Sequence, residues 1–453
     1  MGTNAPSSPL ITCIDDLEAT FHAGSKPRDA WRVGVEYEKP VVDAASGEAV
    51  PYEGERGIGR LLQTLYERFP QWKPVHEGPN IIALEDGLSS ITLEPGGQLE
   101  MSGQQCDSLH CANDELQRHV REIVEVGDLL SIRFLGLGIV PKTPMERIPW
   151  MPKHRYRIMR EIMGRTGKLG RRMMAQTATV QGNFDYSDER DALRKMRVSL
   201  ALGPLLVAVS ANSPIADGAP TGFHSFRAHI WTDTDRDRCG SLPFVFRTES
   251  LFRAYTEYAL GVPMYFIWRD GGYREVGGIT FRRFLDSGYE GERATIADWT
   301  LHLTTLFPEV RLKTYIEVRS ADSQPVDLML GTPALMKGIF YDEASLDAAW
   351  DVVKSWNAAT LSDLHEEAAR FGLGGRAGRM TIGDYAGEIV DIAHAGLARQ
   401  SRRNLKGDDE TIYLDLLAEN VRASRSPATS IIERWEGDWR RNIDALISAT
   451  TYR

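Results

Sequence analysis

The sequence predicts an α+β fold whose antiparallel sheet packs one apolar face on helices and leaves one polar face open to a cavity. Three observations support this prediction. Short segments of alternating apolar and polar residues recur in the first part of the chain, an Asp86-Gly87 turn joins two of them, and amphipathic helical patterns follow. We expect a loose segment at 1–12, an α+β region at 13–332 and a helical region at 333–453, packed together as one structural domain.

Two of the predicted strands bring glutamates together. In the segment VGVEYEK the residues alternate, so Glu36 and Glu38 share one face of a strand, about 7 Å apart. A Pro-Gly-Gly turn follows Glu94 and lets its carboxylate converge with that of Glu100. These four side chains therefore mark the polar face of the expected sheet.

Two further predicted strands also have polar faces. The segment TATVQGNFDY aligns Gln181 with Asn183, and residues 311–319, taken as a single strand, align Glu317 with Arg319. A half-solvated sheet usually carries a more mixed outer face. The repetition over several strands therefore indicates a lined cavity.

Hydrophobic periodicity predicts the remaining elements. They are a helix at 116–130, a strand at 134–140, a buried helix at 193–210 interrupted at Pro204, and C-terminal helices around 346–353, 389–397 and 432–446.

Composition and charge narrow the class of protein. The chain has 453 residues, of which 42% are hydrophobic, which is enough for a large core and excludes global disorder. Its net charge is −10, from 53 basic and 63 acidic residues, so neither nucleic acid nor an anionic membrane is expected as the main partner. We find no signal-peptide pattern and no run of about 20 apolar residues, so a cytoplasmic location is expected.

The cysteines do not suggest a metal site. Cys13, Cys106, Cys111 and Cys239 form no CxxC pair, which disfavours a thiolate zinc site. With so few cysteines in so long a chain, we expect ordinary reduced thiols.

The predicted polar face indicates metal chemistry. Clustered carboxylates repel one another unless cations lie among them. Hard cations such as Mg²⁺ prefer oxygen ligands and often share them with phosphates. Any single glutamate is better explained as a solvated strand residue, but the joint pattern fits two or three Mg²⁺ ions with a nucleoside triphosphate. The expected metal ligands are Glu36, Glu38, Glu94, Glu100 and Glu317.

The usual nucleotide and hydrolase motifs are missing. The chain has no GxxxxGK[ST], and the Gly-rich segment 371–378 follows a helical pattern, so it is interpreted as a linker. It also has no HExxH and no GxSxG. Phosphate binding would have to depend on the carboxylates and on scattered basic residues, for which the candidates are Lys153, Arg155, Arg160, Arg227 and Arg319.

Long motifs resemble the plant-type glutamate–cysteine ligases, a family that also occurs in bacteria. They include VGVEYEK (33–39), SITLEPGGQLEMSG (90–103), MPKHRYRIM (151–159), TATVQGNFDYS (177–187) and the stretch from HLTTLFPEVR to YIEVRSAD (302–322). The resemblance runs from about residue 30 to about residue 445. It implies a glutamine-synthetase-like funnel formed by an antiparallel sheet, with the region 13–332 as the catalytic one.

The resemblance also implies an activity. It is the ATP- and Mg²⁺-dependent joining of the γ-carboxylate of L-glutamate to the amine of L-cysteine through a γ-glutamyl phosphate, in a monomer or homodimer. By motif, Glu317 and Arg319 would be catalytic, Gln181, Asn183 and Arg319 would lie on the ATP side, and Arg155, Tyr156, Arg227 and Trp231 would bind substrate.

The chain differs from the plant members at three positions. They carry regulatory cysteines where this chain has Asn113, Val276 and Leu330, so we do not expect its activity to be controlled by thiols as in plants. The alternatives to a cysteine acceptor are a γ-glutamyl ligase of the same fold that uses another amine, and a carboxylate-rich metallohydrolase. Release of ADP separates the hydrolase from both ligases.

Overall fold

The computed structural model describes residues 8–453. The main sheet contains β1 (Val33–Lys39), β3 (Lys73–Glu77), β4 (Asn80–Glu85), β5 (Ser90–Leu93), β6 (Leu99–Ser102), β8 (Thr179–Phe184), β15 (Val310–Leu312) and β16 (Ile316–Asp322). The short strands are β2 (Val41–Asp43), β7 (Ile132–Phe134), β9 (Ile215–Ala216), β10 (Ala219–Pro220), β11 (Cys239–Gly240), β12 (Phe266–Arg269), β13 (Gly272–Glu275), β14 (Phe307–Pro308), β17 (Arg376–Ala377) and β18 (Met380–Thr381).

Helices surround the sheet. Those before the last sheet strand are α1 (Ile14–His22), α2 (Ile58–Arg68), α3 (Leu109–Leu130), α4 (His154–Thr166), α5 (Gly170–Gln176), α6 (Glu189–Ser210), α7 (Phe226–Trp231), α8 (Leu251–Gly261), α9 (Phe281–Ser287) and α10 (Ile296–Leu303). Those after it are α11 (Gly331–Phe340), α12 (Glu343–Val353), α13 (Ala358–Phe371), α14 (Ile382–Gln400), α15 (Asp415–Arg422), α16 (Pro427–Glu436) and α17 (Ile443–Thr450). None of these helices, over residues 8–453, is long and apolar enough to cross a membrane.

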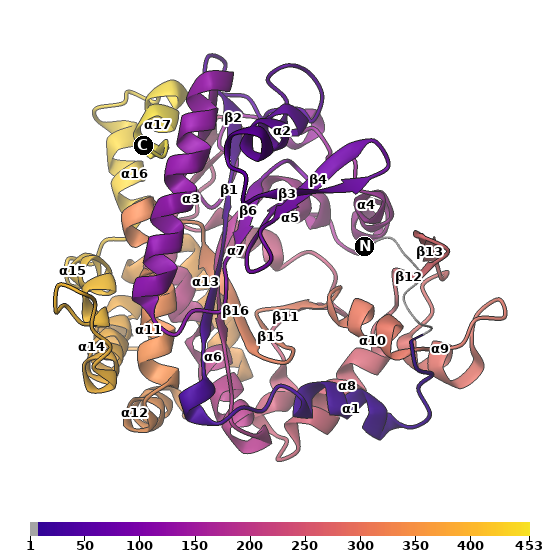
Figure 1. The fold of residues 1–453 in the computed structure, drawn as a ribbon. Coiled ribbons are helices and arrows are strands. Elements are labelled where there is room, and N and C mark those ends of the chain that lie inside the picture. Colours follow the sequence, from indigo (N-terminus) through magenta and orange to yellow (C-terminus); the bar gives the residue numbers. More distant parts are fainter. Residues whose placement is uncertain (1–7) are drawn as a thin grey trace.

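The sheet is antiparallel throughout, in the order β15-β16-β8-β1-β6-β5-β4-β3. Strand alternation decides its two faces, because Val33, Val35 and Tyr37 are buried on one side of β1 while its glutamates face the other. Figure 1 shows the sheet nearly edge-on, with α3 and α11 on one side and α8 and α10 on the other. The predicted α+β class is confirmed, and the polar face is the one that looks toward α8 and α10.

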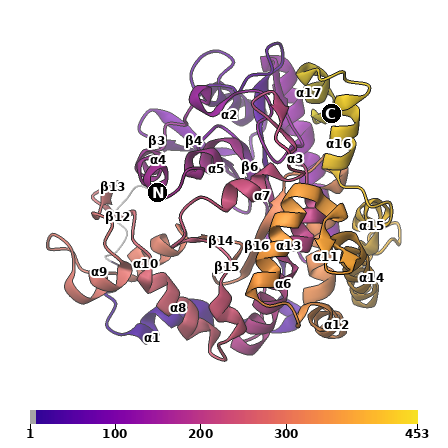
Figure 2. The ribbon, with the colours of Figure 1, turned by 180° about the vertical axis from the view of Figure 1, so that it is seen from behind.

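The N-terminal and C-terminal parts share one core. A single cluster of buried apolar residues runs from Leu17 through β1 and α6 to Leu417 in α15. Figure 2 shows the C-terminal helices lying against α6 and α3 from the opposite view. Of the segment 1–12, residues 1–7 lie outside the described part, and residues 8–11 make hydrogen bonds to residues 294–297. The segment therefore packs on the start of α10 from residue 8 onward.

Four predicted elements differ from the structure. The helix α6 continues through Pro204, since its flanks are buried and that packing outweighs one missing backbone hydrogen bond. The strand predicted at 134–140 ends at Phe134. Residues 311–319 form a hairpin of β15 and β16, and the predicted last helix is divided into α16 and α17 by a Gly437 turn. The turn between β15 and β16 has no breaker residue that periodicity could reveal, whereas Gly437 was a breaker within the predicted last helix.

The expectation that all cysteines are reduced is wrong. Cys106 and Cys111 form a disulfide, with their Cα atoms 5.7 Å apart, while Cys13 and Cys239 are free. Cys106 pairs with Val33 through two backbone hydrogen bonds of 2.8 Å, and Cys111 lies in the first turn of α3. The segment after β6 passes close to the first turn of α3 and so brings the two sulfurs together. The spacing of the cysteines in the sequence did not predict this contact.

Candidate active site

Strand register gathers the predicted glutamates on the polar face. Glu38 pairs directly with Glu100 across β1 and β6. On the other side of β1, Glu36 lies opposite Gln181, and the next pairing places Asn183 opposite Glu317. Side chains at directly paired positions approach within about 5 Å. Four adjacent strands thus contribute to one polar layer.

A glycine turn adds the remaining carboxylate. Glu94 follows β5, and its backbone closes the turn by accepting a hydrogen bond from the Gly97 N–H at 2.9 Å. Gly97 has a φ of 87°, and a Cβ at Gly96 would lie 2.0 Å from the carbonyl oxygen of Ala175. Only glycines fit this close approach to α5. The motif EPGG is therefore required to place Glu94 beside Glu38.

The first carboxylate group consists of Glu38, Glu94 and Glu100. Burial raises the pKa of each, most strongly that of Glu38, and the negative charges of their neighbours add to the effect. Nearby Lys153 donates to the Leu93 carbonyl at 2.9 Å, and burial lowers its pKa to about 8. Burial therefore destabilises the ionised form of each carboxyl in this group, and a cation bound among them would reverse that effect.

The second group consists of Glu36, Asn183 and Glu317. Burial, followed by repulsion from Glu317 and Glu100, raises the pKa of Glu36 to about 7. The Asn183 amide donates to Glu36 at 2.8 Å, whereas its Oδ1 is buried and has no partner among the described residues. An amide oxygen in that condition is suited to a donor or a cation that arrives with a ligand.

Glu317 is neutralised by the protein itself. Burial would raise its pKa, but Arg311, then Lys313 and Arg319, hold that pKa well below its usual range. The Arg311 guanidinium donates to both carboxylate oxygens at 2.6 and 2.8 Å, and Lys313 donates at 3.0 Å. Arg319 bridges Glu317, at 2.8 Å, to Gln181. The two residues predicted to be catalytic, Glu317 and Arg319, thus belong to one ion cluster, and Glu317 holds the guanidinium of Arg319 in place.

The donor chemistry fits Mg²⁺, although residues 8–453 contain no ready-made set of three His, Cys, Asp or Glu ligands. Oxygen donors are what a hard cation requires. The mutual repulsion in the first group and the orphan Asn183 oxygen in the second are both relieved by cations. Glu317 is the exception among the predicted ligands, because Arg311, Lys313 and Arg319 already engage its oxygens.

Two cavities approach the carboxylate layer. The first has a volume of about 540 Å³ and reaches Glu36, Asn183 and Lys313, with backbone-exposing residues such as Gly34 and Gly103 in its wall. The second, of about 570 Å³, is more apolar and reaches Arg319, Arg227 and Trp231. Both sizes are typical of small-molecule sites.

The four predicted substrate residues divide into two places. Arg227 is anchored to the Arg319 carbonyl at 2.9 Å, and its Nε and the Trp231 Nε1 are buried without partners among the residues described. Arg155 lies over the Phe266 ring, 5.8 Å from the centroid, with its charge near Glu94. The hydroxyl of Tyr156 donates to the Leu93 carbonyl at 2.5 Å, so this residue braces the Glu94 turn.

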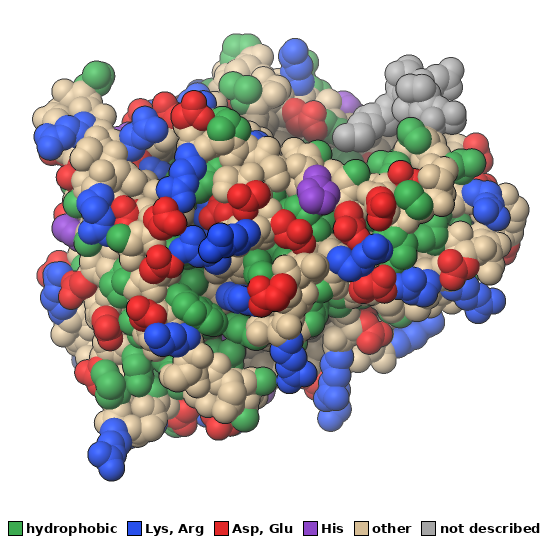
Figure 3. All heavy atoms as spheres, turned by 90° about the horizontal axis from the view of Figure 1, so that it is seen from below, with side chains coloured by type: hydrophobic (Ala, Val, Ile, Leu, Met, Phe, Trp, Pro, Cys, Tyr) green, Lys and Arg blue, Asp and Glu red, His purple; other side chains and the backbone are tan. Residues whose placement is uncertain are grey.

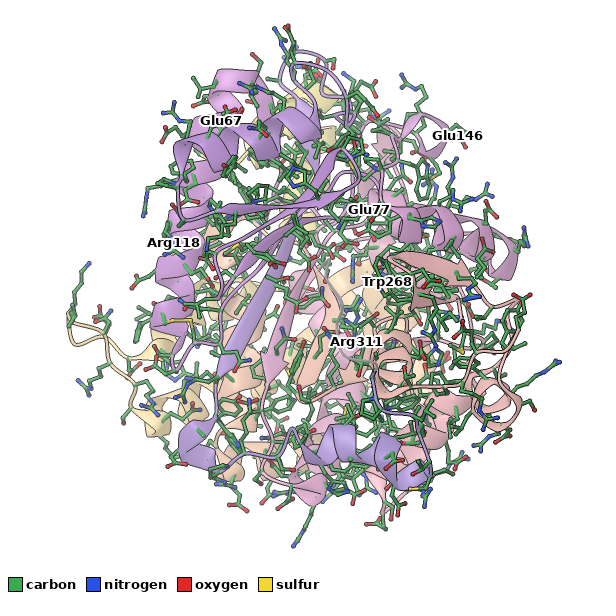
Figure 4. The ribbon with its side chains drawn as sticks, turned by 45° about the vertical axis from the view of Figure 1, so that its right-hand side comes forward. Glu67, Glu77, Arg118, Glu146, Trp268 and Arg311 are labelled. Carbon is green, nitrogen blue, oxygen red and sulfur yellow. A yellow bond between two sulfur atoms is a disulfide. The ribbon has the colours of Figure 1, made fainter. Side chains whose placement is uncertain are left out.

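Arg311 and Lys313 were missed as site residues. Figure 4 shows Arg311 toward the middle of the molecule, while Arg118 lies out on α3. A signal was present in the sequence, because residues 311, 313, 317 and 319 have the same parity and so share a face even in a single extended strand. The hairpin strengthens this relation by pairing Arg311 directly with Glu317.

Comparisons with known proteins show the family of this chain. A family profile described as glutamate-cysteine ligase family 2 matches residues 32–448. The chloroplastic glutamate–cysteine ligase of Medicago truncatula is 42% identical over 440 residues, which is 96% of this chain and 85% of the relative. The Arabidopsis thaliana chloroplastic glutamate–cysteine ligase is 41% identical, over 97% of this chain and 83% of the relative.

A solved structure shares the fold. The glutamate–cysteine ligase of Francisella tularensis, solved in complex with AMP, superposes with a TM-score of 0.57 at 13% identity, over 92% of this chain and 87% of that one. The fold and the family match together define a ligase built on an antiparallel sheet. The chain belongs to glutamate-cysteine ligase family 2.

Proposed function

We propose that this protein joins the γ-carboxylate of L-glutamate to the amine of L-cysteine at the expense of ATP, the first step of glutathione biosynthesis. The observation that carries the proposal is the polar layer of Glu36, Glu38, Glu94, Glu100 and the Glu317–Arg319 cluster, which one cavity meets at Glu36 and a second meets at Arg319. The family membership agrees with it.

We assign the nucleotide to the first cavity. It combines the Lys313 cation with Glu36 and Asn183, and Tyr315 and Arg32 lie in its wall. Its volume of about 540 Å³ accommodates a molecule of this size. The γ-phosphate would then point toward Arg319, and the amino-acid substrates would approach from the side of Arg227, Trp231 and Arg155.

The metal ligands we propose are Glu38, Glu94 and Glu100 for one Mg²⁺, and Glu36 with Asn183 for a second. When bound, Mg²⁺ would neutralise negative charge on the phosphates and so allow the anionic γ-carboxylate to approach them. Glu317 is not one of these ligands. It accepts a hydrogen bond from Arg319 and so orients this arginine, which would contact the phosphate.

The reaction requires activation, because a carboxylate does not react with an amine unaided. An oxygen of the glutamate γ-carboxylate attacks the γ-phosphorus and ADP leaves, which forms a γ-glutamyl phosphate. The planar Arg319 fork is positioned to bind oxygens of the transferring group. The amine then attacks the acyl carbon, phosphate leaves, and the amine nitrogen loses a proton. Arg319 and Arg227 remain near the oxyanion and the substrate carboxylates.

The test is ADP release with glutamate and each of a panel of amines, with the product identified by mass spectrometry. We expect L-cysteine to be preferred, then 2-aminobutyrate, then serine. A methyl in place of SH is rejected by only about 1–3 kcal/mol, whereas a buried hydroxyl needs a partner. A higher kcat/KM with another amine would favour the specialised γ-glutamyl ligase. Absence of glutamate-dependent ADP release would reject both ligases.

A further inference from the structure

A glutamate–histidine pair connects the helical C-terminal region to the hairpin that carries Arg319. Glu309 lies between β14 and β15, and His365 lies on α13. Glu309 Oε2 is 3.1 Å from His365 Nε2, and the two side chains are 22% and 21% exposed. The pair is thus largely shielded from solvent screening.

A glycine provides the space for this pair. A Cβ built on Gly203 of α6 would lie 2.9 Å from Glu309 Oε2 and 3.1 Å from His365 Nε2. A residue larger than glycine at position 203 would therefore collide with these two side chains. Three elements, namely α6, α13 and the β14–β15 turn, enclose the contact.

The backbone of Glu309 leads to the active site. The Arg319 N–H donates to the Glu309 carbonyl at 3.0 Å, and the Glu309 N–H donates to the Gly240 carbonyl at 3.0 Å. Glu309, His365 and Arg319 also line the second cavity together. A displacement of Glu309 would therefore be transmitted to the backbone of Arg319 and to the wall of that cavity.

We propose that the Glu309–His365 pair is a positioning element for Arg319, and that protonation of His365 holds it in place. The proposal rests on the ligase function proposed above. Burial lowers the pKa of His365, but the Glu309 charge more than offsets this and leaves that pKa above its ordinary value. The ion pair is consequently complete at lower pH and is lost as the pH rises through that raised pKa.

Other groups do not replace Glu309 in this role. The further charged or titratable residues around the second cavity are Arg227, His229, Asp235, Arg236, Cys239, Arg319, Glu366 and Arg370. Within residues 8–453, the salt bridge of His365 is made with Glu309 alone. Burial lowers the pKa of His365, so its raised value depends on this one carboxylate.

The test compares three variants across pH 6 to 9, with kcat, the KM of ATP and thermal unfolding measured for each. His365→Arg keeps a permanent positive charge, and His365→Gln replaces the titratable ring with a neutral polar side chain. His394→Gln, on the exposed side of α14, is the matched control. We expect His365→Gln to lower kcat about 3- to 10-fold at the lower pH, with little change in the KM of ATP, because misplacement of a catalytic group costs rate. His394→Gln should follow the wild type.

The dependence of kcat on pH tests whether the positive charge of His365 is what holds the pair in place. We expect the ratio of wild-type kcat to that of His365→Arg to fall as the pH rises. A constant ratio, or an unchanged kcat in His365→Gln with only a lower melting temperature, would overturn the proposal. If His365→Gln does not fold, Glu309→Gln must produce the same loss of kcat, and failure to do so would overturn it as well. An active wild type with unaffected variants rejects this proposal alone, whereas an inactive wild type rejects the ligase function and the proposal together.

Discussion

Charge is balanced differently on neighbouring residues of this site. Glu317 is fully buried yet remains ionised, because Arg311, Lys313 and Arg319 surround it. Glu38 and Glu94 lie together with Glu100, and burial raises the pKa of each of them. Unpaired buried charge is costly, so the first group gains most from an added cation. This difference explains why the two groups should respond differently to mutation.

We expect Glu94→Gln to abolish ligation while the protein stays folded. The change removes one of three converging carboxylates, and losing a metal ligand should cost several kcal/mol of transition-state stabilisation. The variant should also bind Mg²⁺ at least about tenfold more weakly, a loss of about 1.4 kcal/mol. Calorimetric Mg²⁺ titration, ADP release and a thermal melt would be measured together. Glu67→Gln, on the exposed side of α2, is the control, and normal Mg²⁺ affinity in Glu94→Gln would reject the assignment.

Arg319→Lys should lower kcat by about 100-fold and change the KM of ATP by only a few-fold. Lysine supplies a charge but cannot reproduce the planar guanidinium that contacts Glu317 and Gln181 and that, in the proposed mechanism, binds the transferring phosphoryl group. Steady-state kinetics with varied ATP separate the two parameters. Arg118→Lys, far out on α3 in Figure 4, controls for the substitution itself. An unchanged kcat in Arg319→Lys would remove Arg319 from the catalytic residues.

At the scale of elements, short connections hold the strands of the site in register. The disulfide between Cys106 and Cys111 joins the segment after β6 to the first turn of α3. Ser102, Gly103 and Gln105, which precede it, line the first cavity. The crosslink therefore stabilises the wall of the site we assign to the nucleotide.

Reduction of this disulfide should lower the free energy of unfolding by about 2 kcal/mol, according to the loop-entropy relation for so short a loop. Thermal melts with and without dithiothreitol measure the effect, and Cys111→Ser should reproduce it. Cys13→Ser, which changes a free exposed cysteine, is the control. Mass mapping that found both thiols free in the untreated folded protein would contradict the prediction.

At the scale of the whole molecule, the face in Figure 3 intermingles Lys and Arg with Asp and Glu. Beneath the surface, the C-terminal helices complete the core on the apolar face of the sheet. Phe340 of α11 packs against Phe184 of β8, with ring centroids 5.2 Å apart, and both belong to the main cluster. Residues 333–453 therefore cover strands that also carry the site.

A chain truncated after residue 332 should lack a cooperative thermal transition. It would expose the apolar face of β8 and β16. The free energy of unfolding of a domain is small, so the loss of a large part of the core should leave the chain unfolded. Circular dichroism melts and limited proteolysis would test this. Insertion of a short Gly-Ser linker at the exposed Leu405 is the control, because surface loops tolerate insertions. A sharp transition in the truncated chain would show two independent domains.

The sequence by itself determined which side chains share a face. Alternation is a local property of an extended backbone, so Glu36 with Glu38, and Glu317 with Arg319, were placed on the polar side before any strand was paired. Two turns could also be predicted from the sequence, namely the Asp-Gly hairpin between β4 and β5 and the Pro-Gly-Gly turn after Glu94. Each contains a glycine with a positive φ, and that conformation is a local property of the backbone.

Tertiary structure decided what those faces meet. Pairing Arg311 with Glu317 required a turn without a breaker residue, and joining Cys106 to Cys111 required the approach of β6 to α3. By contrast, the uninterrupted α6, which packs on α13, and the two cavities depend on residues more than a hundred positions apart. These long-range contacts depend on the free energy of packing the whole core, and a local pattern does not specify which distant residues they join.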